Sequence, residues 1–104
     1  MSAVLARLEG TEEGLSEDEL RVATGIVYSR FRGHFTDVTR DAMSDGRADL
    51  VVWATRREGP LFRISRWSGR YVAFDDVSGT VHEADGLESL LEALRALYPP
   101  MSVL

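Results

Sequence analysis

The sequence predicts an α+β fold, a two-layer sandwich in which an antiparallel three- to four-stranded meander lies between an N-terminal and a C-terminal helix. Three features predict it: a capped amphipathic stretch near the start, a middle region rich in β-branched and aromatic residues, and a leucine stripe near the end. Each helix has one apolar stripe to bury, so both are expected on one face of the sheet. A chain of 104 residues suits a single domain, residues 1–104.

The first helix is expected to begin directly after Ser16. The run from Ser16 to Glu19 matches a capping box, in which the Ser16 side chain accepts a hydrogen bond from the backbone of Glu19 and the Glu19 side chain reaches back. Leu15 and Leu20 flank the box as a hydrophobic staple. The apolar positions that follow have the period of one buried helical stripe: Leu20, Ala23, Val27 and Phe31.

The middle of the chain is expected to form the strands. Three runs are rich in β-branched and aromatic residues, at 50–57, 61–66 and 70–75, and a weaker fourth run lies at 80–84. Residues 35–39 could add an edge strand. Gly59-Pro60 marks the first turn of the meander.

The turn after Trp67 decides the register of the second hairpin. A three-residue loop, Trp67-Ser68-Gly69, pairs Phe62 with Phe74 and gathers the large apolar side chains on one face. A two-residue turn instead pairs Arg63 with Phe74 and mixes the faces. The three-residue loop is therefore the prediction, and it leaves Trp67 at the tip of the hairpin.

The last helix is expected over the leucine stripe that follows Asp85. Asp85 and Glu88 have the spacing of a second capping box, and Pro99 and Pro100 end the helix. Its buried stripe is expected to consist of Leu87, Leu90, Leu91, Leu94 and Leu97.

Charge is unevenly distributed along the chain. The formal net charge is −5, yet residues 47–70 carry six arginines against two acidic residues, and both flanking segments are net acidic. Every basic residue is arginine. The chain has no cysteine, which excludes disulfides, thiolate nucleophiles and cysteine-bearing metal sites.

No catalytic constellation is evident in the sequence. His82 and Glu83 are adjacent, but neighbouring side chains of a strand point to opposite faces, so they do not make a metal site. Asp75 and Asp76 precede Val77-Ser78-Gly79, a composition typical of a polar turn. Neither a glycine-rich phosphate loop nor a nucleophile elbow occurs. We therefore expect no enzyme activity, no catalytic residues, no cofactor and no metal.

Localisation follows from what the chain lacks. No apolar run approaches the ~20 residues that span a bilayer, and the first ten residues lack the basic start and apolar stretch of a signal peptide. A cytoplasmic location without membrane contact is therefore expected.

The remaining candidate is a binding surface in the arginine-rich segment, formed by Arg63, Arg66, Trp67, Arg70 and Tyr71. Tryptophan, tyrosine and arginine are the residues most often dominant at protein interfaces. The same combination also binds phosphates and stacks on bases. Because acidic flanks disfavour a polyanion, a protein partner is the prediction and nucleic acid is the alternative. A purely structural role for these residues also stays open.

Two further alternatives concern the partner. The order helix, strands, helix resembles the double-stranded RNA-binding domain in topology. That family carries lysines at the start of its final helix, where this chain has Asp85 and Glu88, so membership is not indicated. A homodimer through the open face of the sheet is also possible, because Trp53 on that face would leave an apolar patch to cover.

Overall fold

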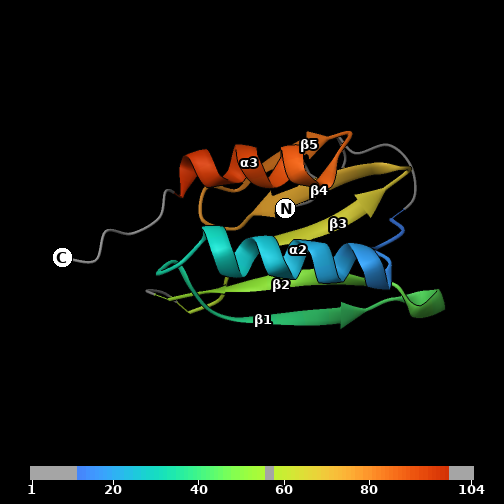
Figure 1. The fold of residues 1–104 in the computed structure, drawn as a ribbon, viewed down its shortest axis with the longest axis horizontal. Coiled ribbons are helices and arrows are strands. Elements are labelled where there is room, and N and C mark those ends of the chain that lie inside the picture. Colours follow the sequence, from blue (N-terminus) through green and yellow to red (C-terminus); the bar gives the residue numbers. More distant parts are fainter. Residues whose placement is uncertain (1–11, 56–57, 99–104) are drawn as a thin grey trace.

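The computed structural model describes residues 12–55 and 58–98, without the side chain of Ser44. Figure 1 labels the elements of this part of the chain. They are α2 (Glu17–Arg30), β1 (Phe35–Ala42), the short 3-10 turn η1 (Ser44–Gly46), β2 (Ala48–Ala54), β3 (Pro60–Trp67), β4 (Arg70–Asp75), β5 (Thr80–Ala84) and α3 (Leu87–Leu97).

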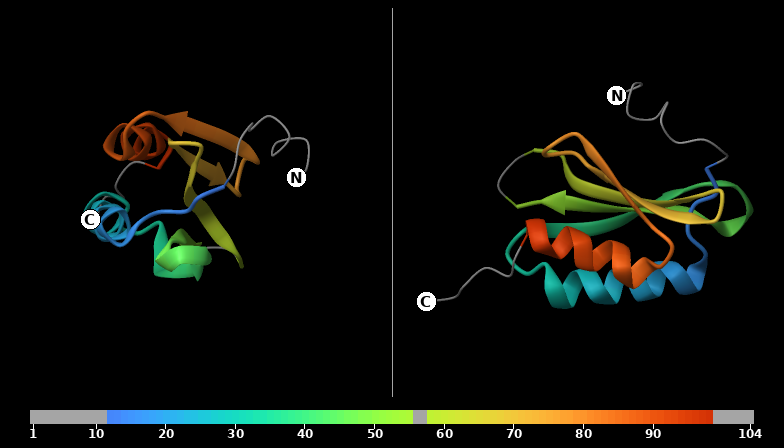
Figure 2. Two further views of the ribbon diagram at one scale, coloured as in Figure 1. Left: turned by 90° about the vertical axis from the view of Figure 1, so that its right-hand side faces the viewer. Right: turned by 90° about the horizontal axis from the view of Figure 1, so that it is seen from above.

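The strands form one antiparallel sheet in the order β1-β2-β3-β4-β5. Helices α2 and α3 contact each other and lie together on one side of this sheet, as Figure 2 shows. We call the side that they cover the helix face and the opposite side the outer face. The predicted α+β architecture, with its helices flanking the meander in sequence, is confirmed.

The predicted count of three to four strands is wrong, because β1 adds a fifth at the edge of the sheet. Among its side chains, those of Phe35 and Val38 pack against the core, while Asp37 and Arg40 are exposed. This is the edge strand that the sequence left open at residues 35–39, and it extends to Ala42. Its few buried positions give it no apolar run, so its full extent was not evident from the sequence. It also contains a register shift between Phe35 and Asp37, a bulge of the kind common at sheet edges.

The turn between β3 and β4 has two residues, so the predicted three-residue loop is wrong. Ser68 and Gly69 have φ angles of 48° and 83°, both positive as in a type I′ hairpin turn. Trp67 pairs with Arg70 as the last residue of β3, and Arg63 pairs with Phe74.

The loop prediction assumed that large apolar side chains gather on one face only. The outer face also buries apolar side chains, since Val51 and Val72 are 3% and 1% exposed. With apolar residues buried on both faces of the central strands, alternation of polarity could not select the register.

The two helices differ at their N-terminal ends. The capping box of α2 is confirmed: Ser16 N donates to Glu19 Oε1 at 2.8 Å, and Glu19 N donates to Ser16 Oγ at 3.3 Å. The prediction of a second capping box at Asp85 and Glu88 is wrong, because Gly86 caps α3 without a side-chain hydrogen bond. Asp85 lies 3.4 Å from the Arg70 guanidinium instead.

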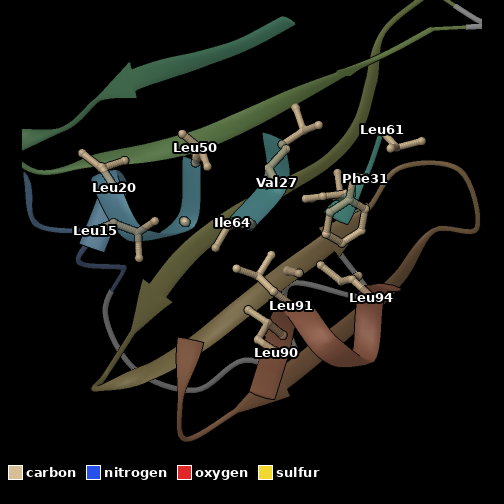
Figure 3. Close-up of a cluster of buried hydrophobic side chains, with 14 of the residues drawn as sticks. Leu15, Leu20, Val27, Phe31, Leu50, Leu61, Ile64, Leu90, Leu91 and Leu94 are labelled. Carbon is tan, nitrogen blue, oxygen red and sulfur yellow. The ribbon is translucent and has the colours of Figure 1, made fainter. Parts of the chain in front are cut away.

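The core fills the space between the helices and the helix face of the sheet (Figure 3). Leucines of α3 meet aromatic and aliphatic side chains of α2 and the strands there, and Leu97 is left 52% exposed at the end of the predicted stripe. The largest fully buried members include Leu20, Val27, Phe31, Leu50, Phe62, Ile64, Leu90, Leu91 and Leu94.

Residues 12–15, which we call the crossing segment, occupy a fork between β2 and β3. The direct pairing of these strands reaches Leu50 and Ile64, and beyond it Ala48 and Arg66 bond to the crossing segment. Glu13 N donates to Arg66 O at 2.7 Å, and Leu15 exchanges two backbone hydrogen bonds with Ala48, at 2.8 and 3.0 Å. The segment thereby joins the outer face, where Glu12 contacts Ser65, to the core, which contains Leu15.

Candidate functional site

The outer face of the sheet is the candidate site, because neither described helix covers it (Figure 2). The register places one row of outer-face residues across all five strands. Its members are Thr39, Val51, Arg63, Phe74 and Val81. An arginine and an aromatic ring therefore stand side by side at the centre of this face.

Trp53 is the most exposed aromatic side chain of the outer face among the residues described, at 36%. Its indole Nε1 donates to Thr39 Oγ1 at 2.8 Å, from β2 to the edge strand β1. The sequence left open whether this residue is core or surface. The structure places it on the surface, with its ring fixed by a hydrogen bond.

Arg63 lies between two carboxylates of neighbouring strands. Its Nη1 is 3.2 Å from Asp49 Oδ2 and 3.0 Å from Asp41 Oδ2. The Asp49 side chain is 2% exposed, whereas that of Asp41 is 56% exposed. Arg63 therefore compensates a buried charge while 38% of its own side chain stays in contact with solvent.

Trp67 and Arg70 face each other at the turn between β3 and β4. The Trp67 ring meets Phe74 edge on, with ring centroids 6.3 Å apart, and within the described part of the chain its buried Nε1 has no acceptor. The Arg70 guanidinium, on a half-exposed side chain, lies 3.4 Å from the carboxylates of both Glu83 and Asp85. Three of the predicted site residues, Arg63, Trp67 and Arg70, thus share the outer face.

The structure places the other two predicted residues, Arg66 and Tyr71, on the helix face. Both contact Glu19 in the first turn of α2: Arg66 Nη1 lies 3.4 Å from Glu19 Oε2, and the Tyr71 hydroxyl donates to the same oxygen. The Arg66 guanidinium also stacks on the Tyr71 ring, 5.6 Å from its centroid. These contacts fasten the start of α2 to the sheet.

Glu19 is ionised at neutral pH for reasons visible in its contacts. Burial alone would raise its pKa, but hydrogen bonds from Ser16 and Tyr71, together with the charge of Arg66, lower that pKa below its ordinary 4.5. The hydrogen bond to Glu19 and burial raise the pKa of Tyr71 above 10. Near pH 7, Glu19 is therefore ionised and accepts the hydrogen bond, while the Tyr71 hydroxyl keeps the proton that it donates.

A groove of about 470 Å³ lies between the β4–β5 turn and the last turn of α3. One edge carries a chain of hydrogen-bond contacts, 2.7 Å between Ser78 Oγ and Thr80 Oγ1 and 3.2 Å between Thr80 Oγ1 and His82 Nε2. Val77 and Leu97 add exposed apolar surface. The His82 ring lies at the end of this chain of contacts.

The polar turn predicted after Asp75 is confirmed. The Asp75 carboxylate accepts hydrogen bonds from the backbone N–H groups of Val77 and Ser78, at 3.0 and 3.3 Å, and from the Tyr98 hydroxyl at 2.8 Å. This buried carboxylate joins the turn to the end of α3. The contact with Tyr98 has no counterpart in the sequence pattern, because the two residues are distant in the chain.

Two observations on the described ranges bear on other kinds of site. Within them, no three His, Asp or Glu side chains are grouped so as to hold a metal ion. No helix in the same ranges is long and apolar enough to cross a membrane.

No family model, curated protein or solved structure matches the chain. Function is therefore inferred from the residues themselves and from their geometry.

Proposed function

We propose that this protein is a non-catalytic module that binds another protein through the outer face of its sheet. Trp53 carries the proposal, because its large ring is exposed on a face that neither described helix covers. A tryptophan held in one orientation loses little conformational entropy on binding and is a typical energetic centre of an interface.

The neighbours of Trp53 support the same function. Phe74 and Trp67 add partly exposed aromatic surface. Arg63 adds a guanidinium group at the centre of the outer face, and Arg70 adds another at the turn between β3 and β4. Aromatic and arginine side chains with a polar rim are the usual composition of protein interfaces.

The ion pairs of the outer face support a partner with basic residues. Arg63 and Arg70 are each balanced by two carboxylates of this chain, and the side chains of Asp41 and Asp85 are 56% and 92% exposed. Carboxylates therefore prevail at the rim, and a partner with basic residues around an apolar centre fits best. The same balance weighs against nucleic acid, whose phosphates need unneutralised cations.

The test compares two exposed aromatic residues on opposite layers. A partner is first captured from nuclease-treated source lysate and purified, and its affinity is then measured for the wild type, for Trp53→Ala and for Tyr28→Ala. Tyr28 is the matched control, because its ring is 51% exposed on α2. Trp53→Ala should weaken binding about 30-fold, equivalent to about 2 kcal/mol, and Tyr28→Ala should change it less than about twofold.

Other results would assign the molecule differently. Equal affinities of wild type and Trp53→Ala would remove the outer face from the contact. Recovery of nucleic acid without nuclease, with affinity falling steeply as salt rises, would favour the nucleic-acid alternative. A dimer in sedimentation that Trp53→Ala dissociates would identify the partner as a second copy of this chain.

A further inference from the structure

The crossing segment meets the outer face at a cluster of polar side chains. Ser65 is fully buried, and its hydroxyl lies 3.5 Å from Glu12 Oε1. Asp49, 1% exposed, belongs to the same cluster, because the pairing of Leu50 with Ile64 sets Asp49 opposite Ser65 on the outer face. The crossing segment therefore meets both β2 and β3 at these side chains.

One atom of this cluster is incompletely bonded. Asp49 Oδ2 lies 3.2 Å from Arg63 Nη1, but the buried Asp49 Oδ1 has no hydrogen-bond donor among the described residues. A buried carboxylate oxygen without a donor is costly. Two ionised carboxylates cannot share a hydrogen bond, because neither has a proton to donate.

We propose that Glu12 and Asp49 share one proton, and that this proton latches the crossing segment into the fork between β2 and β3. A protonated Glu12 carboxyl supplies Asp49 Oδ1 with the donor that it lacks. The pair is then a carboxylic acid bonded to a carboxylate, with Arg63 compensating the single negative charge. The latch involves only contacts within the chain and does not depend on the proposed function.

The charges around the pair favour this protonation state. Of the described groups facing Glu12, β2 contributes Asp49 and β3 contributes Arg63 and Ser65, while Asp41 of β1 competes for the same guanidinium. With both carboxyls ionised, Arg63 would face three carboxylates. Burial, followed by the hydrogen bond and the charge of Asp49, raises the pKa of Glu12 from 4.5 to about 7.

The direction of the pH dependence follows from that raised pKa. Glu12 has its ordinary pKa when the segment is released, so the latch is fully closed below about pH 4.5 and weakens as pH rises through 7. Above that point two carboxylates repel each other within the fork. The chain thereby contains a device that loosens residues 12–15 in mildly alkaline solution.

The test reads the carboxyl and the backbone separately. The Glu12 side-chain carboxyl is titrated by carbon NMR in the wild type, and amide exchange of Leu15 and Ala48, which bond to each other, is followed at about pH 5.5 and about pH 8.5. We expect a titration midpoint within about one unit of 7 and a fall of at least about tenfold in both protection factors.

Two variants separate the latch from general effects of pH. Glu12→Gln, whose amide donates at every pH, should hold the protection factors nearly constant between the two conditions. Glu13→Gln is the matched control, because Glu13 accepts from the backbone of Gly69 and should leave the wild-type response intact. A Glu12 midpoint near 4.5, unchanged protection in the wild type, or loss of the response in Glu13→Gln would each overturn the proposal.

Discussion

The indole N–H of Trp53 donates to the hydroxyl of Thr39 across the β1–β2 pair. This bond fixes an exposed ring of β2 to the edge strand of the sheet. An interface residue that is held in its bound orientation before the partner arrives pays less entropy on binding. The contact thus joins an edge strand that the sequence barely indicates to the residue that carries the proposed function.

Removing the hydrogen bond between Trp53 and Thr39 should make the indole ring more mobile while Trp53 itself stays in place. Thr39→Val keeps the shape of the side chain and should lower the free energy of unfolding by about 1 kcal/mol. The wavelength of Trp53 fluorescence should also shift toward that of an indole without this hydrogen bond. This is measured in a Trp67→Phe background, so that the signal comes from Trp53. Thr36→Val, at an exposed position of the same strand, is the control and should change neither quantity. Identical behaviour of the two valine variants would contradict this role of Thr39.

Two glycines should respond in opposite directions to the same substitution. Gly14 has a φ of 78°, and a Cβ there would lie 2.8 Å from Met43 Sδ and 3.3 Å from Ala48 N. Gly14→Ala should therefore lower the free energy of unfolding by about 2 kcal/mol or more. Gly25 lies within α2 with no atom within 4 Å of such a Cβ, so Gly25→Ala should raise stability by about 1 kcal/mol. Urea denaturation measures both, and a stable Gly14→Ala protein would show that the crossing segment is adaptable.

Arg63 and Arg70 each pair with two carboxylates, but one partner of Arg63 is buried. Arg63→Met leaves Asp49 without its cation and should cost about 3 kcal/mol. Arg70→Met breaks only pairs in contact with solvent and should cost less than about 1 kcal/mol. Thermal unfolding at low and moderate salt distinguishes the two, and equal losses would refute a structural role for the Arg63–Asp49 pair.

Tyr71→Phe should weaken the attachment of α2 in a pH-dependent manner. The hydroxyl bonds to ionised Glu19, whose lowered pKa adds stability above pH 4.5 that disappears as pH falls through the folded-state pKa. The variant should lose about 1.5 kcal/mol at pH 7, because hydrogen bonds to charged groups are the stronger ones. That loss should shrink as pH falls through the folded-state pKa of Glu19 and the carboxyl becomes protonated. A loss that does not vary with pH would contradict an ionised acceptor.

Local patterns predicted the elements that are determined locally. The capping box of Ser16 and Glu19 depends on four consecutive residues, and the stripes of α2 and α3 depend on helical spacing, so each was readable from the chain. The two-residue turn and β1 depend on what packs against them from elsewhere. Val72 is buried on the outer face although its neighbours there include charged residues, and no local pattern announces that.

The sequence also did not show that the predicted site residues lie on two different faces of the sheet, because the strand register depends on packing from elsewhere in the chain. Arg63, Arg66 and Arg70 look alike in the sequence, but the parity of the strand register sends Arg66 to the helix face and the other two to the outer face. Once the two-residue turn is known, this division follows. The carboxylates that each arginine contacts come from distant segments, and those pairings required the folded structure.

The most direct test of the outer face as a binding surface is an NMR cross-saturation measurement on the complex with the captured partner. Saturating the partner's protons attenuates signals of residues that lie against it. We predict loss of intensity at the indole N–H of Trp53 and the guanidinium N–H of Arg70, with amides of α2 unaffected. Attenuation centred on α2 and α3, with the Trp53 signal unchanged, would contradict the account.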